Sequence, residues 1–376
     1  MFNSTGFRYK YIPMLSLAVS EMEAIEELPE KDKELILPLV PLRGWVASND
    51  LVKSICRIEK AIGDRSWIAD IDSSFLSDNK HYQLTGKYPR PVFYDIEKLL
   101  NPEQGYENWF VYLRDIALNA IPCLQLSDLG QLAEQVTKLK SLKRGVVLNI
   151  KMDEVGVTTL NFIADTLFNI EVKELLIICD YGDISRINLS YYQQYMSLLE
   201  QLKVKLPTAL FSISSTSFPY SFSDSYRGER PIYERLVFNK IRNENDRIRL
   251  IYSDRASTRA KRMKGGGGIP PPRVDYPLKD DWRYIRKEFL DAKNATKEEK
   301  IKLYQEAAME VIKSDYWEAS LKLWGTQLIE RSAKGDSFGI TSASKATAVR
   351  INIHLYKQLH YDDVLDDLDT DDEWVD

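Results

Sequence analysis

The sequence predicts an α/β fold, a (β/α)8 barrel of the TIM type with a C-terminal helical extension. One observation is residues 175–183 (LLIICDYGD), an apolar run ending in turn residues, which is typical of a strand buried on both faces. A second is that this unit of strand and amphipathic stretch recurs until eight strands are counted. A third is that no GxGxxG motif follows the first strand, which disfavours a dinucleotide-binding sheet.

Short apolar runs that end in polar residues predict the eight strands. In chain order they are residues 11–18, 35–42, 67–72, 122–127, 145–152, 175–183, 208–214 and 247–253. Alternating strands and helices by themselves imply only a parallel sheet. The count of eight favours a closed barrel over an open, doubly wound sheet.

Amphipathic spacing predicts the helices between these strands. They are residues 20–28, 50–62, 94–100, 106–119, 128–142, 158–170, 189–205 and 232–243. Ser20 can cap the first helix, and the negative charges of Glu21 and Glu23 in its first turn stabilise the helix through the positive end of its dipole. The helix at 94–100 lies in an insertion, residues 73–104, that we otherwise expect to be irregular because it is rich in Tyr, Pro and Asp.

The pattern changes after the eighth strand. We expect the barrel to occupy residues 1–258, a basic, Gly- and Pro-rich linker residues 259–281, and the helical extension residues 282–361. The extension has helical spacing at residues 282–290, 296–313, 316–332 and 342–360. Residues 362–376 read as an acidic, disordered tail.

The net charge of −5 hides an uneven distribution. The tail holds nine acids and no base, so the rest of the chain carries +4. A basic cluster precedes the glycine run and consists of Arg255, Arg259, Lys261, Arg262 and Lys264. It suits the phosphates of a nucleotide or nucleic acid, or is a solvated loop. The tail could also fold over this basic surface and compete with an anionic ligand.

Composition indicates a cytoplasmic protein. Hydrophobic residues at 44% and charged residues at 28% are ordinary for a soluble globular chain. No window approaches the roughly 20 apolar residues that cross a bilayer, so we expect no membrane insertion, and the first residues lack the order of a secretion signal. Cys56, Cys123 and Cys179 stand in apolar contexts and are expected to be reduced core thiols.

Polar side chains gather at the ends of the predicted strands, where the active sites of such barrels lie. The candidate catalytic residues are Asp70, Asp72, Asp180 and Asp254. The candidate ligand-binding residues are Glu21, Arg43, Lys151, Arg255 and Arg273. Together they would suit acid–base chemistry or a phosphorylated ligand. The alternative is a structural ion-pair network that closes the top of the barrel, since such networks also perturb carboxylates.

The residues disfavour several chemistries. None of the three histidines, His81, His354 and His360, stands at a strand end, which argues against a Ser-His-Asp triad. No CxxC or HxxxH spacing exists, so we expect no metal site built from Cys or His. The glycine run lacks the Lys-Ser/Thr of a phosphate-binding loop and reads as a hinge.

An ordered series of short motifs resembles the beta protein family of phages and bacterial defence islands. The motifs are YIPML from residue 11, LPLVP from 37, IADID from 68, DYG from 180, SFP from 217, YSD from 252, PPRVDYP from 271 and RINIHL from 350. The resemblance covers residues 8–360. It implies a component of an anti-phage module of the gop-beta-cll type, with partner proteins encoded in the same operon, and it implies no catalytic residues or cofactor.

Two functions of different classes remain open. The first is an interaction or sensing protein that restrains a toxic effector partner. The second is a barrel enzyme acting on a phosphorylated or nucleic-acid ligand through the strand-end carboxylates, which could hold a divalent ion such as magnesium. The two are distinguished by whether the acids surround an open pocket or are neutralised by Arg43, Lys151 and Arg255.

Overall fold

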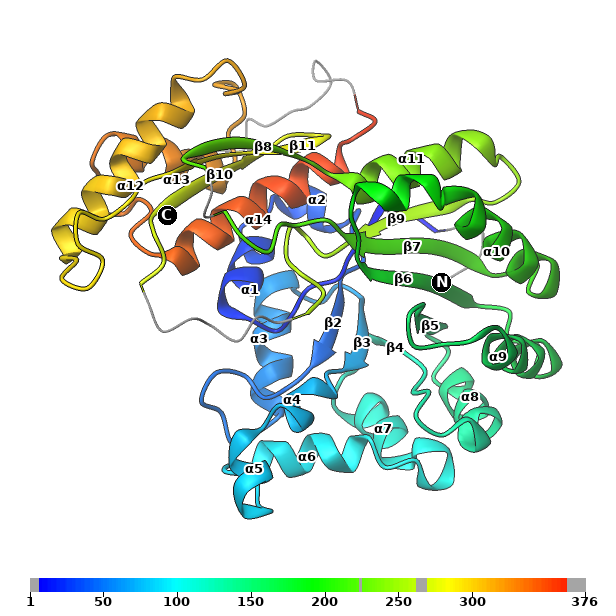
Figure 1. The fold of residues 1–376 in the computed structure, drawn as a ribbon. Helices are drawn as coiled ribbons and strands as arrows, with labels where there is room; N and C mark the ends of the chain where they lie inside the picture. Colours follow the sequence, from blue (N-terminus) through cyan, green and yellow to red (C-terminus); the bar gives the residue numbers. More distant parts are fainter. Residues whose placement is uncertain (1–6, 223–224, 262–268, 364–376) are drawn as a thin grey trace.

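A computed structural model describes residues 7–222, 225–261 and 269–363 of the chain. Parallel strands and their helices form one side of the molecule, and the C-terminal helices with a small antiparallel sheet form the other (Figure 1). Arg262, Lys264 and the predicted tail beyond Asp363 lie outside the described residues. Within the described part, no helix combines the length and apolar character needed to pass through a membrane.

The eight predicted strands are present and parallel. They form a five-stranded sheet of order β1-β9-β7-β6-β5 and a three-stranded sheet of order β2-β3-β4. Their bounds are β1 Tyr11–Pro13, β2 Leu39–Leu42, β3 Trp67–Ile71, β4 Ala120–Pro122, β5 Val146–Lys151, β6 Leu175–Asp183, β7 Leu210–Thr216 and β9 Leu250–Asp254. Each overlaps one predicted run, which confirms the α/β class and the parallel arrangement.

Isolated bridges join the edges of the two parallel sheets. Tyr11 pairs with Ile36 and Met14 with Leu39 at the edge between β1 and β2, and Cys123 pairs with Val147 between β4 and β5. Proline interrupts the ladders here, because Pro13 ends β1 and Pro122 ends β4, and proline has no N–H to donate. The two sheets are therefore not one continuous ladder, and the closed (β/α)8 barrel stays a prediction.

Strand β6 is apolar on both faces, as its sequence predicts. Leu176 and Ile178 join a small cluster to which all eight parallel strands or the residues flanking them contribute. Leu175, Ile177 and Cys179 point the other way, into the larger cluster between strands and helices. Successive strand side chains alternate between faces, so a strand between two apolar layers reads as a continuous apolar run.

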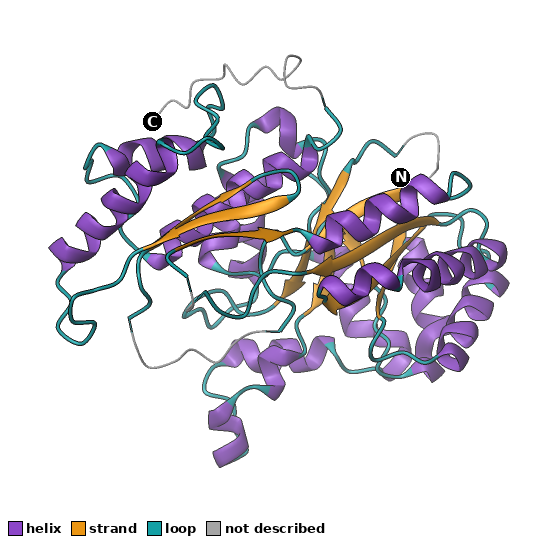
Figure 2. Ribbon diagram, turned by 45° about the horizontal axis from the view of Figure 1, so that its top comes forward, coloured by secondary structure: helices purple, strands orange, loops and turns teal. Residues whose placement is uncertain are grey.

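Helices surround the parallel strands (Figure 2). Their bounds are α1 Val19–Glu26, α2 Glu30–Lys33, α3 Val52–Ile62, α4 Ser74–Ser77, α5 Lys80–Thr85, α6 Pro91–Leu99, α7 Glu103–Asp115, η1 Leu129–Gln131, α8 Leu132–Ser141, α9 Val157–Asn169, η2 Arg186–Ser190, α10 Tyr192–Lys205 and α11 Tyr233–Glu244. The insertion predicted to be irregular holds α4 and α5 besides the expected α6. Asn79 accepts a hydrogen bond from the Tyr82 amide and caps α5.

The C-terminal third contains a sheet that the sequence reading missed. Strands β8 Arg227–Pro231, β10 Arg273–Pro277 and β11 Asp281–Arg286 form an antiparallel sheet of order β10-β11-β8. The helix predicted at residues 282–290 is therefore wrong, and β10 lies inside the range predicted as linker. Trp282 and Tyr284 pack into one aromatic cluster while Ile285 packs into another, which is the period of two expected of a strand.

The other C-terminal helices are present as α12 Lys297–Ile312, α13 Trp324–Ala333 and α14 Ala343–Leu359. Helix α13 begins later than predicted, since residues 316–323 form turns and irregular chain. Helix α14 is buried along nearly its whole length and packs on α1, α13 and β10. A helix enclosed on all sides is held by its neighbours, so α14 joins the parallel strands to the antiparallel sheet.

Gly228 allows β8 to approach β11, so Gly228→Ala should weaken the antiparallel sheet. An added Cβ would lie 2.3 Å from the hydroxyl oxygen of the buried Tyr284. We expect a loss of about 1–3 kcal/mol in unfolding free energy, measured by urea denaturation. Glu229→Ala, the matched control on the same strand, removes only an exposed ion pair to Arg283 and should cost less than about 1 kcal/mol. Equal stability of the two variants would contradict the close approach.

Candidate functional site

A cavity of about 660 Å³ opens at the carboxyl ends of the parallel strands. Five of the nine predicted site residues line it: Asp70, Asp72, Lys151, Asp180 and Arg255. They come from β3, β5, β6 and the turn after β9, so strand ends remote in sequence do meet in one place. The other four predicted residues, Glu21, Arg43, Asp254 and Arg273, are not part of this lining.

Asp70 has only neutral hydrogen-bond partners. Its Oδ1 accepts from the Ile71 amide at 2.8 Å and from Gln125 Nε2 at 3.3 Å. Its Oδ2 accepts from Asn149 Nδ2 at 3.3 Å. Burial raises the pKa of Asp70, and these hydrogen bonds together with the charge of Lys151 only partly oppose that rise. The carboxyl group is thus an incompletely compensated acid in the cavity wall.

The neighbouring acids are neutralised. Arg43 Nη1 lies 3.2 Å from Asp72 Oδ2, so the charges of these two residues neutralise each other. Asp180 is 2% exposed, accepts from the Gly182 amide at 3.0 Å and forms an ion pair with Arg255. These pairs match the structural-network alternative.

Lys151 is not one of the groups that neutralise the strand-end acids. Its Nζ lies 3.4 Å from Glu154 Oε1, and both side chains are more than half exposed. An exposed pair of this kind contributes little to stability. Lys151 is therefore only loosely held by Glu154.

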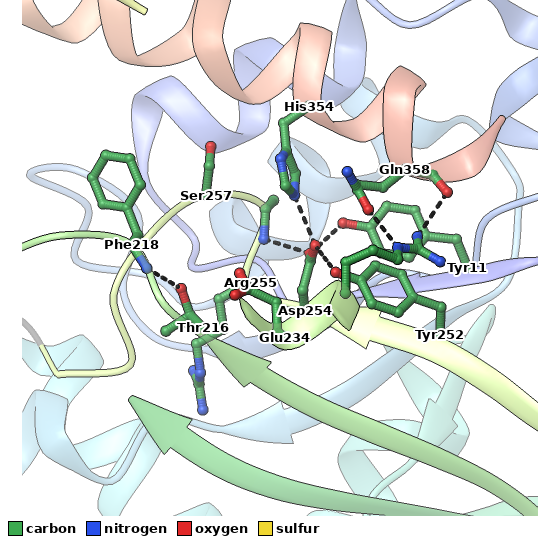
Figure 3. A network of polar contacts seen from close by, with 12 residues as sticks. Tyr11, Thr216, Phe218, Glu234, Tyr252, Asp254, Arg255, Ser257, His354 and Gln358 are labelled. Atoms are coloured by element: carbon green, nitrogen blue, oxygen red, sulfur yellow. Dashed lines mark hydrogen bonds and ion pairs between the residues drawn. The ribbon is translucent and has the colours of Figure 1, made fainter. Parts of the chain in front are cut away.

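Asp254 is fully buried at the centre of a polar network (Figure 3). Its carboxylate accepts from the Tyr11 hydroxyl, from Tyr252 Oη at 2.9 Å, from the Ala256 amide at 2.8 Å, and it bonds His354 Nε2 at 2.7 Å. Burial alone would raise the pKa of Asp254, but His354 and the other donors outweigh it and hold the pKa below its ordinary value. Asp254 was predicted to face the cavity, whereas the structure places it in a closed joint.

Glu21 and Arg273 are also paired with other residues of the chain and do not line the cavity. Glu21 accepts hydrogen bonds from the amide and the hydroxyl of Ser16, which itself lines the cavity. Arg273 Nε lies 2.7 Å from Asp275 Oδ1, and Arg350 Nη1 lies 2.9 Å from Asp275 Oδ2. The contacts of Glu21 with Ser16 hold the edge of the cavity in place. The contact of Arg350 with Asp275 joins α14 to β10.

Several residues of these networks escaped the sequence reading. Arg259 and Lys261 line the cavity but were considered only as part of the basic cluster. Tyr220 donates to Asp183 Oδ2 at 2.7 Å and lies under the Arg259 guanidinium at 4.7 Å. His354 was not among the predicted site residues, and no local signal pairs it with Asp254 because the two are 100 residues apart.

The described start of the tail is attached away from the cavity. Asp363 lies 3.2 Å from Lys10 Nζ, and Asp362 lies 2.6 Å from Arg242. Lys10 directly precedes β1, so it stands at the amino ends of the strands, while the cavity lies at their carboxyl ends. The predicted competition of the tail with an anion falls on residues outside the described range.

No cluster of three or more His, Cys, Asp or Glu side chains that could hold a metal ion is found within residues 7–222, 225–261 and 269–363. The cysteines are free thiols; Cys123 and Cys179 are buried as expected. Cys56 is exposed, because it lies on the outward face of α3, and its prediction as a core thiol is wrong.

A family model described as Beta protein matches residues 11–360, nearly all of the described chain. The chain belongs to the beta protein family. The resemblance read from the ordered motifs is thereby confirmed. "Protein beta" of Enterobacteria phage P4 is 26% identical in an alignment of 366 residues that covers 95% of each chain.

One solved structure is similar over most of its length. It is the enoyl reductase domain of MlnA from the macrolactin biosynthesis cluster of Bacillus amyloliquefaciens, which covers 94% of this chain and 82% of its own at 10% identity. The TM-score is 0.37, so this likeness carries no argument about the beta protein.

Asp254→Asn should destabilise the protein strongly. The amide nitrogen would face hydroxyl, amide and imidazole donors inside a buried joint, so we expect a loss of about 3 kcal/mol or more in unfolding free energy. The matched control is Asp72→Asn, which removes the partly exposed pair with Arg43 and should cost about 1 kcal/mol or less. Urea denaturation measures both. A cost as small as that of the control would show that Asp254 does not hold the joint.

Stability should fall as the pH rises from about 5 to 8. Burial raises the pKa of Glu21 to about 7 and that of Glu234 to about 8. Burial by itself would lower the pKa of His360. Its hydrogen bonds to Asp32 and Asp363 outweigh this effect and raise the pKa above its ordinary value. Folded chains thus bind more protons than unfolded chains in this range, and the stabilisation is lost as each group deprotonates.

The urea midpoint measured at several pH values tests this expectation. Glu234→Gln should flatten the pH dependence, because it removes one of the linked groups. Glu229→Gln, an exposed control, should leave the slope unchanged. A wild-type midpoint that rises from pH 5 to 8 would contradict the linkage.

Proposed function

We propose that this member of the beta protein family is an interaction and sensing component of an anti-phage defence module. It restrains a toxic effector encoded in the same operon and uses the strand-end cavity for recognition. The observation that carries the proposal is the pairing of the predicted acids. Asp72 and Asp180 are neutralised by arginines and Asp254 is enclosed, so the wall favours binding over acid–base chemistry.

The architecture proposed with this function is a (β/α)8 barrel. The bridges Met14–Leu39 and Cys123–Val147 support closure, because they join the two pairs of sheet edges. The shared apolar cluster supports it too, since residues in or beside all eight parallel strands contribute to it. The division at residue 258 belongs to the same proposal, with the long α14 as the element that joins the C-terminal part to the strands. The predicted boundary at residue 281 separates the paired strands β10 and β11 and is not retained.

A second candidate is an enzyme that acts on a phosphorylated or nucleic-acid ligand. Asp70 favours it, because burial raises the pKa of this carboxyl and makes it a stronger base than an ordinary carboxylate. Lys151, Arg255 and Lys261 in the same wall could contact phosphates. Magnesium binding by the strand-end carboxylates belongs to this candidate.

A growth and plaque assay in cells carrying the native operon tests the interaction proposal. Deleting this chain should make the operon toxic in the absence of phage, since the effector is no longer restrained. Asp70→Asn should abolish most of the phage protection, because it changes the exposed chemistry of the cavity without a large change in volume.

The matched control is Glu229→Gln, at an exposed acid on β8 outside the cavity lining, which should keep protection near that of wild type. Soluble expression is compared for all variants. A deletion strain that grows normally would contradict restraint of an effector. Unchanged protection by Asp70→Asn would remove the cavity from the function.

A further inference from the structure

The cavity wall contains a carboxylate without a cationic partner. Asp70 forms no ion pair within 4.0 Å among the described residues, and its hydrogen bonds come from one amide N–H and two side-chain amides. A carboxylate removed from water without a counter-ion is costly, and the cost is relieved when a cation is supplied. Asp70 thus has unused capacity for a positively charged donor.

Asn149 adds a second acceptor beside Asp70. Its Nδ2 is directed to Asp70 Oδ2, while its Oδ1 is shielded from solvent and has no hydrogen-bond partner. Buried amide oxygens are normally paired, so an unpaired one in a cavity wall indicates a missing donor. Asp70 therefore offers its carboxylate to the cavity from the end of β3, and the unpaired Asn149 oxygen lies behind the cavity surface on β5.

The charge of the wall favours a cation over an anion. The acids are Asp70, Asp72, Asp78, Asp153, Glu154, Asp180 and Asp183, and the bases are Lys151, Arg255, Arg259 and Lys261. Arg255 is engaged with Asp180 and Arg259 with the Pro219 carbonyl, whereas Lys151 forms only the exposed pair with Glu154. An anionic ligand would meet an excess of negative charge, whereas a cation would reduce it.

We propose that the cavity binds the guanidinium group of an arginine side chain presented by the effector on Asp70, a carboxylate that the hydrogen bond from Asn149 positions. A planar guanidinium has five N–H donors in a fixed fork and can pair with a carboxylate through two of them at once. A volume of about 660 Å³ admits the side chain together with neighbouring residues of the partner. This inference rests on the proposed restraint of an effector and names the chemistry of the contact.

Calorimetric titration of the full chain with agmatine, a small guanidinium compound, tests the site. We expect saturable binding that weakens about tenfold or more in Asp70→Asn, as the loss of a charge-assisted contact implies. Binding should also weaken as the pH falls and Asp70 becomes protonated, since burial raises the pKa of this carboxyl. Glu229→Gln, at an exposed acid outside the cavity lining, should change the affinity by less than about threefold, because exposed charges are screened.

A second variant and an anion complete the test. Asn149→Ala should weaken agmatine binding several-fold while leaving Asp70 in place, so the site is examined even where Asp70→Asn folds poorly. Inorganic phosphate should not displace agmatine. Equal binding by wild type and both variants, or saturable phosphate binding in place of agmatine binding, would overturn the guanidinium site.

The two proposals fail separately. Agmatine binding that depends on Asp70, together with normal growth of the deletion strain, would support the guanidinium site and contradict restraint of an effector. A toxic deletion strain, together with no agmatine binding, would support restraint and contradict the site.

Discussion

The buried carboxylate of Asp254 is the interaction on which the arrangement of this beta protein depends. It ends β9, receives hydroxyl donors from β1 and β9, and bonds His354 on α14. A buried charge is tolerated only when its hydrogen-bonding capacity is filled, so each donor must stay in place. The joint therefore fixes the C-terminal helix on the parallel strands.

The same joint shapes the cavity. The chain turns sharply after β9, with Ala256 at φ 46° and Ser257 at φ 58°, a backbone region that side chains disfavour. Two hydrogen bonds stabilise this strained turn: the Ala256 amide donates to Asp254, and Arg350 Nε donates to the Ser257 hydroxyl oxygen at 3.2 Å. This turn places Arg255 against Asp180, so the cavity wall depends on contacts made behind it.

The pairing of acids and bases separates structural residues from residues free to meet a ligand. Arginines neutralise Asp72 and Asp180, and the interior encloses Asp254, whereas Asp70 meets only neutral donors. Asp70 therefore gives the wall a negative charge that no ion pair balances among the described residues. The proposed function of the family member and the proposed guanidinium contact both rest on this difference.

The sequence by itself determined the parallel elements and much of the cavity, because apolar periodicity is local and the carboxyl ends of parallel strands meet. It placed Asp70, Asp72, Lys151, Asp180 and Arg255 at those ends, where the structure brings them together. It could not predict the strand at 281–286, whose partners at 227–231 and 273–277 are set by long-range pairing. Nor could it separate Asp254 from Asp70, since burial depends on α14, which approaches Asp254 from 100 residues away. Only the tertiary structure decided which acids are enclosed, because enclosure is a property of contacts between distant segments.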